Sequence, residues 1–316
     1  MKKISIIGLS LFVVGLIGSI ITLQFVDKSE QLITDNITIS NNLYDINDID
    51  INLEYFDEIY LVAEERQDIK IEYKVFKESH IPSISSENNN LTVKQGGTFF
   101  SYFNSGSLKW YLNNNGKTSI TINLPQKQYN RINFSTSIGE GKITDINTNS
   151  LVFFSNIGNF NITANSNFVD IESDLGSLEY TSLAKRGSTL EADTNSGSLT
   201  INNASFDEFD INADIGELFI NGLTGKGKIE TNVGSVDVNY AKWDGDLELS
   251  NNIGDVNITL PNGSGAYIES ASDIGKVAVQ LKDFNSTISS GIYSVNGDGM
   301  HKIKVETDIG NVKIRD

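Results

Sequence analysis

Apolar and polar residues alternate in short segments along most of the chain beyond residue 130. Apolar residues two positions apart, such as Leu199 with Ile201 and Val236 with Val238, are separated by polar residues. This period of two is typical of a strand that buries one face. A second alternating segment precedes each corner, and no helical period of comparable length follows residue 27. The pattern therefore predicts two short strands and a corner in each repeat.

One five-residue motif recurs nine times between residues 137 and 312. Its positions are, in order, a polar residue that is usually Asn or Asp, a small or branched residue, Gly, a variable residue and an apolar residue. The first eight glycines are 18–21 residues apart, and the last gap is 35. The nine are Gly139, Gly158, Gly176, Gly197, Gly216, Gly234, Gly254, Gly275 and Gly310. Such a fixed period is the signature of a solenoid. We expect an all-β chain, a single-layered parallel β-solenoid of about nine coils of about 19 residues each.

The glycines are interpreted as a structural turn motif. Glycine adopts positive φ at a corner, and an Asn or Asp side chain can bond the backbone amide two residues on. Stacked coils also place these polar side chains in a column, where neighbouring amides can bond one another and neighbouring carboxylates repel. At this position of the motif, Asp and Asn alternate from one repeat to the next over part of the chain, as at Asp174, Asn195, Asp214 and Asn232. The long last gap predicts an irregular or missed coil between Lys276 and Asp308.

Four segments follow from these patterns. Residues 1–26 are predicted to be a transmembrane signal anchor and residues 27–48 a polar juxtamembrane stalk. Residues 49–130 are predicted to form a β-rich N-terminal cap, which a solenoid needs because a bare end exposes unpaired strand edges. Residues 131–316 are the predicted solenoid.

The amino-terminal segment predicts a single membrane crossing. Lys2 and Lys3 precede an almost uninterrupted apolar run from Ile4 to Val26, and about 20 apolar residues cross a bilayer. The length favours an uncleaved helix, although Gly18-Ser19 leaves cleavage open. Positive charge at the start places the N-terminus in the cytoplasm and the rest of the chain outside the cell membrane.

An aromatic segment at residues 98–112 stands apart from the repeats. It is interpreted as a hairpin around an Asn-Ser-Gly-Ser turn. One interpretation is an exposed contact surface for a partner or for the membrane interface. The other, which we favour, is packing against the first coil, because aromatic residues are more often buried. The aromatic residues are Phe99, Phe100, Tyr102, Phe103, Trp110 and Tyr111.

Charge and composition narrow the partners and cofactors. The formal net charge of −17 argues against binding nucleic acid. The chain has no cysteine, which removes a thiol nucleophile and any thiolate metal site. No cofactor is predicted. Calcium is a weaker alternative at the corners through Asp174, Asp214, Asp273 and Asp308, but each of these side chains is better explained by turn formation.

Two stretches carry a family resemblance. The chain reads ITINLP at 120–125 followed by INFSTSIG at 132–139, and VNITLP at 256–261 followed by IESASDIG at 268–275. These motifs resemble the bacterial putative-adhesin family of β-strand repeats, which includes LiaG-like membrane-anchored envelope proteins. The resemblance covers about residues 50–316. It implies the repeat fold and an envelope location, and it brings no catalytic residues.

The sequence favours a non-enzymatic extracytoplasmic module that acts as an adhesin-like binder, a scaffold or an envelope-stress accessory protein. Its partner would be an envelope protein or glycan, and a basic partner domain would suit the acidic surface. The alternative is a carbohydrate-active lyase or hydrolase, which needs an acid and a base at a defined separation. His80 and His301 are far apart in the chain, and the basic pair Lys185-Arg186 is interpreted as a solvated corner.

Overall fold

The computed structural model describes residues 32–39, 46–96, 117–282, 284–288, 290–295 and 301–316. These residues form 22 strands, and their one helical element is a 3-10 turn, η2 (Glu78–His80). None of their helices has the length and apolar character needed to cross a membrane. The predicted anchor, residues 1–26, lies outside the described residues.

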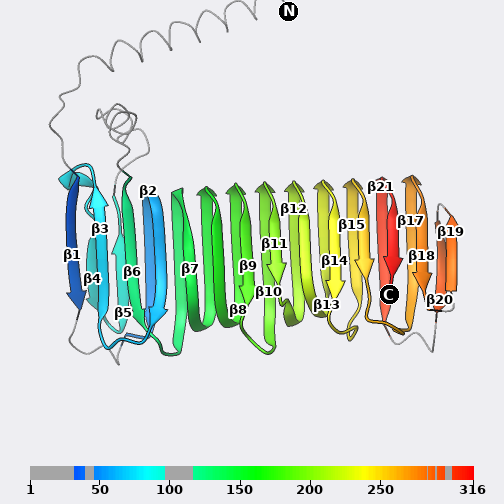
Figure 1. Ribbon diagram of the computed structural model, residues 1–316, viewed down its shortest axis with the longest axis horizontal. Helices are drawn as coiled ribbons and strands as arrows, with labels where there is room; N and C mark the ends of the chain where they lie inside the picture. The colour runs from blue at the N-terminus through cyan, green and yellow to red at the C-terminus, as the bar shows by residue number, and fades with distance from the viewer. Residues whose placement is uncertain (1–31, 40–45, 97–116, 283, 289, 296–300) are drawn as a thin grey trace, which may run out of the picture.

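The strands wind into a flattened solenoid with two parallel rows of strands (Figure 1). In a typical coil a long strand leads to a corner glycine, a short strand follows on the other row, and a loop returns to the next coil. The first row contains, in spatial order, β2 (Asp48–Glu64), β7 (Tyr129–Ile157), β8 (Phe160–Leu175), β10 (Gly187–Ser196), β12 (Ser205–Ile215), β13 (Leu218–Val233), β15 (Leu247–Ile253), β21 (Lys302–Ile309) and β17 (Ala266–Ile274).

The second row continues the coils beyond the corner. β2 and β7 run through a corner without a break, β8 and β13 run without a break through the return opposite the corner, and parts of all four strands belong to both rows. Its separate strands are β9 (Leu178–Ser182), β11 (Leu199–Asn202), β14 (Val236–Tyr240), β16 (Val256–Thr259), β22 (Val312–Arg315) and β18 (Val277–Leu281). The all-β, solenoid-like architecture predicted from the period is confirmed.

The core lies between the two rows and is built by the alternation seen in the sequence. Leu199, Ile201, Val236 and Val238 are at most 1% exposed, and the residues between them face outward. Each inward position stacks on its counterpart in the next coil, because the coils pair in register. Burial of one aliphatic side chain contributes about 1.5–3 kcal/mol, so a column of such residues stabilises neighbouring coils together.

The amino-terminal end is closed by strands that lie outside β2. β5 (Asn90–Lys94) and β6 (Ser119–Pro125) pair parallel with β2, and β2 in turn pairs with β7. Three strands then finish the edges in antiparallel pairing: β4 (Ser83–Glu87) on β5, β3 (Ile69–Val75) on β6, and β1 (Ile33–Ile39) on β3. In chain order the parallel pairing thus begins at Asp48, the last residue of the segment 27–48 that was predicted as a stalk, and β1, from the same segment, pairs with β3 of the cap.

The carboxyl-terminal end contains the largest departure from chain order. β21 and β22 lie between the β15–β16 coil and the β17–β18 coil, with parallel pairing on both sides (Figure 1). The outer coil is then covered by antiparallel β19 (Phe284–Ile288) on β18 and β20 (Ser290–Val295) on β17. The gap that predicted an irregular coil is therefore an end cap followed by a strand pair that returns inward.

The corner differs in one respect from the geometry predicted for it. We predicted that each Asn or Asp would bond the glycine amide two residues on. That amide instead donates to the next coil, as from Gly158 to Leu175 O at 2.9 Å and from Gly197 to Ile215 O at 2.8 Å. The polar side chains bond along their column, with Asn195 donating to Asp174 at 2.6 Å. A backbone ladder takes the amide because stacking brings a carbonyl into line with it in every coil.

Candidate functional site

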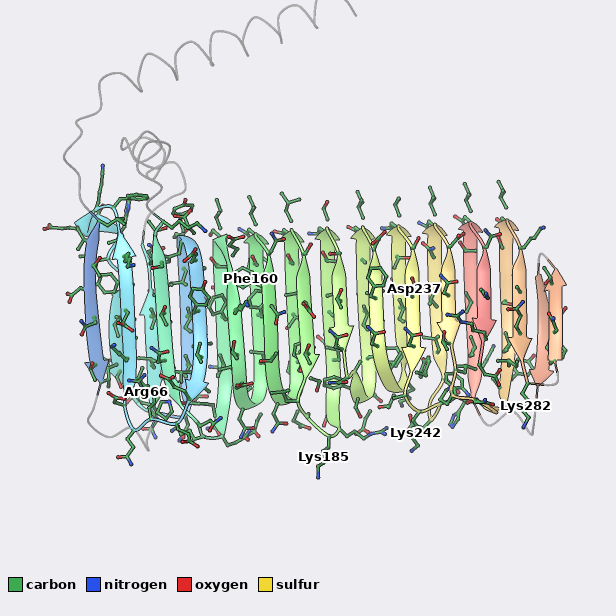
Figure 2. All side chains as sticks on the ribbon, viewed as in Figure 1. Arg66, Phe160, Lys185, Asp237, Lys242 and Lys282 are labelled. Atoms are coloured by element: carbon green, nitrogen blue, oxygen red, sulfur yellow. The ribbon has the colours of Figure 1, made fainter. Side chains whose placement is uncertain are left out.

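Aliphatic side chains form an exposed ridge along the corner edge of the solenoid. Among the described residues, eight large hydrophobic side chains are exposed, and seven of them occupy the position just before a corner glycine. A row of side chains stands out from this edge at regular intervals in Figure 2. The seven are Ile157, Leu175, Ile215, Val233, Ile253, Ile309 and Ile274, with exposed fractions from 43% to 67%. We call them, in this spatial order, the aliphatic ridge.

Register aligns the ridge from coil to coil. Ile157 pairs with Leu175, Ile215 with Val233, and Ile253 with Ile309, which then pairs with Ile274. Parallel pairing places successive members about 4.8 Å apart. Ser196 lies between Leu175 and Ile215 and interrupts the ridge. The longer uninterrupted part therefore runs over five coils, from Ile215 to Ile274.

Polar columns flank the ridge on both sides. On one side Asn232 donates to Asp214 at 2.6 Å and Asn252 donates to Asn232 at 3.0 Å. On the other side, the Asn311 side chain and backbone amide both donate to Asp255, at 3.1 and 2.8 Å. These bonds hold the corners in line, so the edge presents a straight apolar strip between two hydrophilic margins.

The interior behind the corner is polar and small. Thr231, Asn251 and Ser272 lie in one buried column, two residues before the ridge. Ser272 donates to Gly310 O at 2.7 Å, and Asn251 donates to Gly254 O at 2.9 Å. Such bonds fix the corner backbone, so the ridge side chains project from a rigid edge.

A second feature is a shallow depression on the first row, over β10, β12, β13, β15 and β21. Its volume is about 630 Å³, and it is lined by Lys226, Lys228, Lys302 and Lys304 together with carboxylates such as Glu248. Gly227 also lines it, and the neighbouring Phe209 occupies the space that a side chain at Gly227 would fill. The depression brings acids and bases together, which the enzyme hypothesis requires.

The lysines of this depression are held in the charged form. Lys226 bonds Glu208 at 2.9 Å, and Lys302 bonds Glu269 at 2.7 Å. Lys304 contacts both Glu248 and Glu306 at 3.3 Å. In each case the hydrogen bond to a glutamate raises the pKa of the lysine. A lysine that acts as a general base needs a lowered pKa, so these side chains are poorly suited to that role.

Carboxylates crowd the same row nearer the amino-terminal end. Burial, followed by repulsion from Asp193, raises the pKa of Asp170. Burial also raises the pKa of Glu172, with Asp174 and Asp193 adding to the effect. This face therefore carries part of the large negative charge of the chain, which disfavours contact with anionic polymers.

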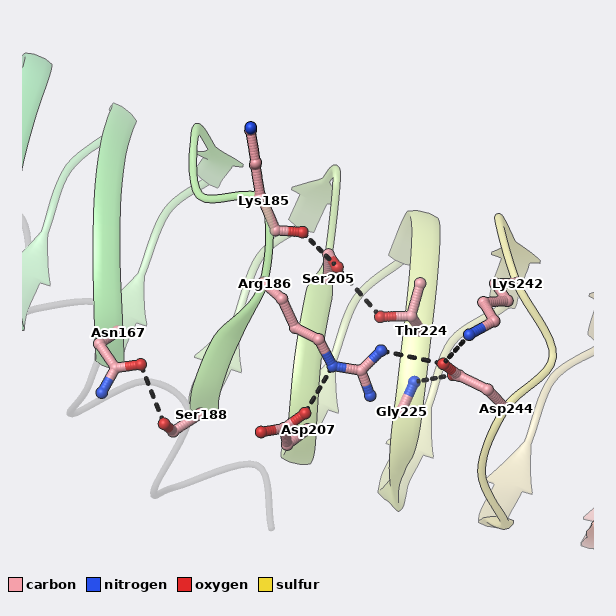
Figure 3. Close-up of polar contacts among 10 residues, drawn as sticks. All are labelled: Asn167, Lys185, Arg186, Ser188, Ser205, Asp207, Thr224, Gly225, Lys242 and Asp244. Carbon is pink, nitrogen blue, oxygen red and sulfur yellow. Dashed lines mark hydrogen bonds and ion pairs between the residues drawn. The ribbon is translucent and has the colours of Figure 1, made fainter.

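The loop edge opposite the ridge contains a charged clamp (Figure 3). Arg186 donates to Asp207 at 2.5 Å and to Asp244 at 2.9 Å, and thereby joins the coils of β10, β12 and β15 across the coil of β13. Asp244 also accepts from the Gly225 amide at 2.8 Å and pairs with Lys242 at 3.1 Å. Lys185 contributes only its carbonyl, to Ser205 at 2.9 Å, and its side chain points away (Figure 3). Lys185 is exposed to solvent, as predicted for the basic pair, whereas Arg186 forms ion pairs that connect different coils.

The clamp predicts a pH-dependent contribution to stability. Burial of Asp244 opposes ionisation, but bonds from Arg186, Gly225 and Lys242 outweigh it and lower its pKa from 3.8 to about 2. A depressed carboxyl pKa stabilises the fold above pH 4, and that stability is lost as the pH falls toward 2. Asp244→Asn should therefore cost about 2 kcal/mol at neutral pH and progressively less below pH 4. Urea unfolding across this pH range measures the change.

Asp207→Asn is the matched control for Asp244→Asn. The Asp207 side chain is 61% exposed, so removal of its charge should cost less than about 1 kcal/mol. Equal losses for the two variants, or a loss at Asp244 that does not shrink in acid, would contradict the assignment.

The predicted site residues fall at separate places. Seven corner glycines have positive φ, and Gly139 and Gly275 do not. His80 is buried in η2, where burial and, to a smaller extent, the charge of Lys77 lower its pKa. His301 lies toward the carboxyl-terminal end of the solenoid, with its Nδ1 3.7 Å from Asp246 Oδ1. Neither histidine is near the other, as the spacing in sequence suggested. The aromatic segment 98–112 lies outside the described residues.

The calcium candidates share the Asx column but not one site. Asp273 and Asp308 are neighbours because β21 pairs with β17. Asp174 and Asp214 accept bonds from Asn195 and Asn232 instead. Within the described residues, no three His, Asp or Glu side chains are grouped as a metal site.

The sequence interpretation missed the ridge as a surface. Its signal was present, since the residue before each corner glycine is aliphatic at nearly every repeat. We assigned that residue to the turn, where a small or branched side chain is unremarkable. Only the register shows that these residues align on one exposed edge.

Comparison with known proteins agrees with this architecture. The pattern that defines the Toastrack DUF4097 family matches residues 46–315. The chain belongs to that family. No match is found among curated proteins. The Toastrack match begins two residues before β2 and ends at Arg315, the last residue of β22, so it leaves out β1.

Solved structures similar to this Toastrack chain include two putative adhesins and a putative cell adhesion protein, each from a different bacterium. A putative adhesin from Bacteroides fragilis is 13% identical, covers 92% of this chain and 99% of its own, and has a TM-score of 0.41. A putative adhesin from Parabacteroides distasonis is 11% identical, with coverage of 90% and 98% and a TM-score of 0.42. A putative cell adhesion protein from Clostridium sporogenes is 15% identical, with coverage of 90% and 99% and a TM-score of 0.24.

Proposed function

We propose that this Toastrack protein is a membrane-anchored, extracytoplasmic binding module without enzymatic activity. The observation that carries the proposal is the aliphatic ridge. Soluble proteins rarely expose apolar patches of more than a few hundred Å² unless the patch binds something. Here seven of eight exposed large hydrophobic residues in the described part of the chain gather on one edge. The apolar run from Ile4 to Val26 supports the anchor, with the solenoid outside the cell membrane.

Among the roles that the sequence left open, the ridge favours an adhesin-like binder or scaffold of the envelope. Aliphatic side chains offer no hydrogen-bond donor or acceptor to sugar hydroxyls, so a protein partner suits the ridge better than a glycan. The charged lysines of the depression disfavour the carbohydrate-active alternative, because none has the lowered pKa of a base.

A site-specific photo-crosslinker tests the proposal in living cells. Benzoylphenylalanine placed at Ile253 should give a discrete adduct of the full chain with an envelope protein. The matched position is Leu183, which is 49% exposed but lies outside the ridge. Equal adducts at both positions, or none at Ile253, would contradict a ridge-mediated function. Turnover of wall glycans by the purified protein would contradict the non-enzymatic part.

A further inference from the structure

From the shape and charge of the ridge we infer the chemistry of its partner: a basic amphipathic α-helix of another protein, lying lengthwise on the ridge from Ile215 to Ile274. This inference rests on the proposed binding function and adds the class of partner. It is carried by three features of the edge, namely its spacing, its charged margins and its interruption at Ser196.

Spacing favours a helix over an extended strand. Ridge members follow one another at about 4.8 Å, the distance between paired strands. A helix advances about 5.4 Å per turn, so over five coils the two repeats drift apart by less than half a turn. Side chains on one face of an extended strand are about 6.7 Å apart and lose register within two or three coils. One apolar side chain per helical turn can therefore seat between successive ridge members.

The margins of the same five coils are acidic. Asp214, Asp308 and Asp273 lie before the ridge residues, and Glu217 and Asp255 follow the glycines on the other side. All five carboxylates are exposed, and the only lysine at these margin positions is Lys276, in the last coil. A helix with an apolar stripe bordered on both sides by Lys or Arg is complementary to this arrangement.

The same charges weigh against two other occupants. An anionic lipid surface would meet the carboxylates first and be repelled. A second copy of the ridge would bring two acidic margins together, which also opposes association. The interruption at Ser196 limits the apolar strip to five coils, which matches about 14–16 helical residues at 1.5 Å each.

The test uses the full chain in phosphatidylcholine nanodiscs and an 18-residue fluorescent helix of leucine and lysine, with leucines at i, i+3, i+4 and i+7. The comparison peptides are a leucine–glutamate helix of the same pattern and the leucine–lysine composition in scrambled order. Anisotropy should show at least about tenfold tighter binding of the basic helix than of either comparison peptide, with the advantage over the acidic helix shrinking in high salt.

Two substitutions on the ridge locate the site. Val233→Ser with Ile253→Ser should weaken the basic helix by about tenfold or more, since both anchors lie at the centre of the strip. Serine is compatible with the corner because Ser196 occupies the equivalent position. Leu183→Ser is the control and should change binding by less than about twofold. Unchanged thermal melts of both variants show that the fold is kept.

The outcomes separate the inference from the function on which it rests. Equal binding of acidic and basic helices, or no effect of the ridge variant, would overturn the inference. A crosslink from Ile253 in cells without helix binding would leave the binding function standing and exclude a basic helix as the partner. Ridge-dependent flotation with phosphatidylglycerol vesicles, or ridge-dependent dimers in sedimentation, would replace the helix by lipid or by a second copy.

Discussion

Removal of residues 301–316 is expected to unfold the carboxyl-terminal end of the solenoid rather than trim it. Although these residues end the chain, β21 and β22 lie between two coils and pair with strands on both sides. Ile303, Val305, Val312 and Ile314 are fully buried. Burial of four such side chains contributes roughly 6–12 kcal/mol, as much as the net stability of many domains. The truncated chain should lose its cooperative melt and become sensitive to protease between residues 260 and 295.

A synthetic peptide of residues 301–316 provides the control for this truncation. Added in excess, it should restore the melt and the protease resistance, because the gap between the two coils offers strand edges on both sides. A peptide with Ile303→Ser and Val305→Ser keeps the backbone donors but loses the buried side chains, and it should not restore them. A truncated protein with an unchanged melt would show that the two coils close directly on each other.

The coils themselves could be read from the sequence, because each repeats the same local physics. Alternation sets the buried face, as at Leu199 and Ile201, and glycine marks the corner. The order of the coils in space could not be read. The motif Asp308-Ile309-Gly310 has the same kinds of residue as the motifs of the other coils, and every coil offers similar strand edges to the coil on either side. The gap of 35 residues signalled an irregularity without showing that the chain returns inward.

The candidate site was less accessible than the fold for a different reason. Ile215 and Ile253 were visible as aliphatic residues in a turn, but a single exposed aliphatic residue has no particular meaning. Their significance comes from register, since only stacking turns isolated corners into a strip. The same stacking explains the missed hydrogen bonds: the Gly197 amide reaches the next coil, so the Asn195 side chain is left to bond Asp174.

Arg186 shows the limit of local interpretation in the opposite direction. A basic pair in a loop is usually solvated, and this describes Lys185 correctly. The partners of Arg186, Asp207 and Asp244, are 21 and 58 residues away in sequence, and the repeat period does not predict a contact with Asp244. A residue whose role depends on irregular loops can be assigned only when those loops are placed.

Gly216→Ala is expected to be among the most damaging single substitutions in the solenoid. A Cβ at this position would lie 1.6 Å from Gly197 O, and the residue has a φ of +145°, which side chains rarely adopt. Neither neighbour can yield, because Gly197 and Gly216 belong to the same backbone ladder. The substitution combines a steric clash with backbone strain and should cost more than about 4 kcal/mol. Thermal unfolding of the variant measures the loss.

Two other glycines separate the causes of that loss. Gly263 has a φ of +78° but open space around its Cβ position, so Gly263→Ala should show only the conformational cost of about 1–2 kcal/mol. Gly96 has open space and no positive φ, and Gly96→Ala should stay within about 0.5 kcal/mol. If Gly216→Ala were no worse than Gly263→Ala, the corner would have room for a side chain. The aliphatic ridge is straight because the corners are too tight for a side chain at the glycine. A corner that widened to accept one methyl group would displace the ridge residue beside it.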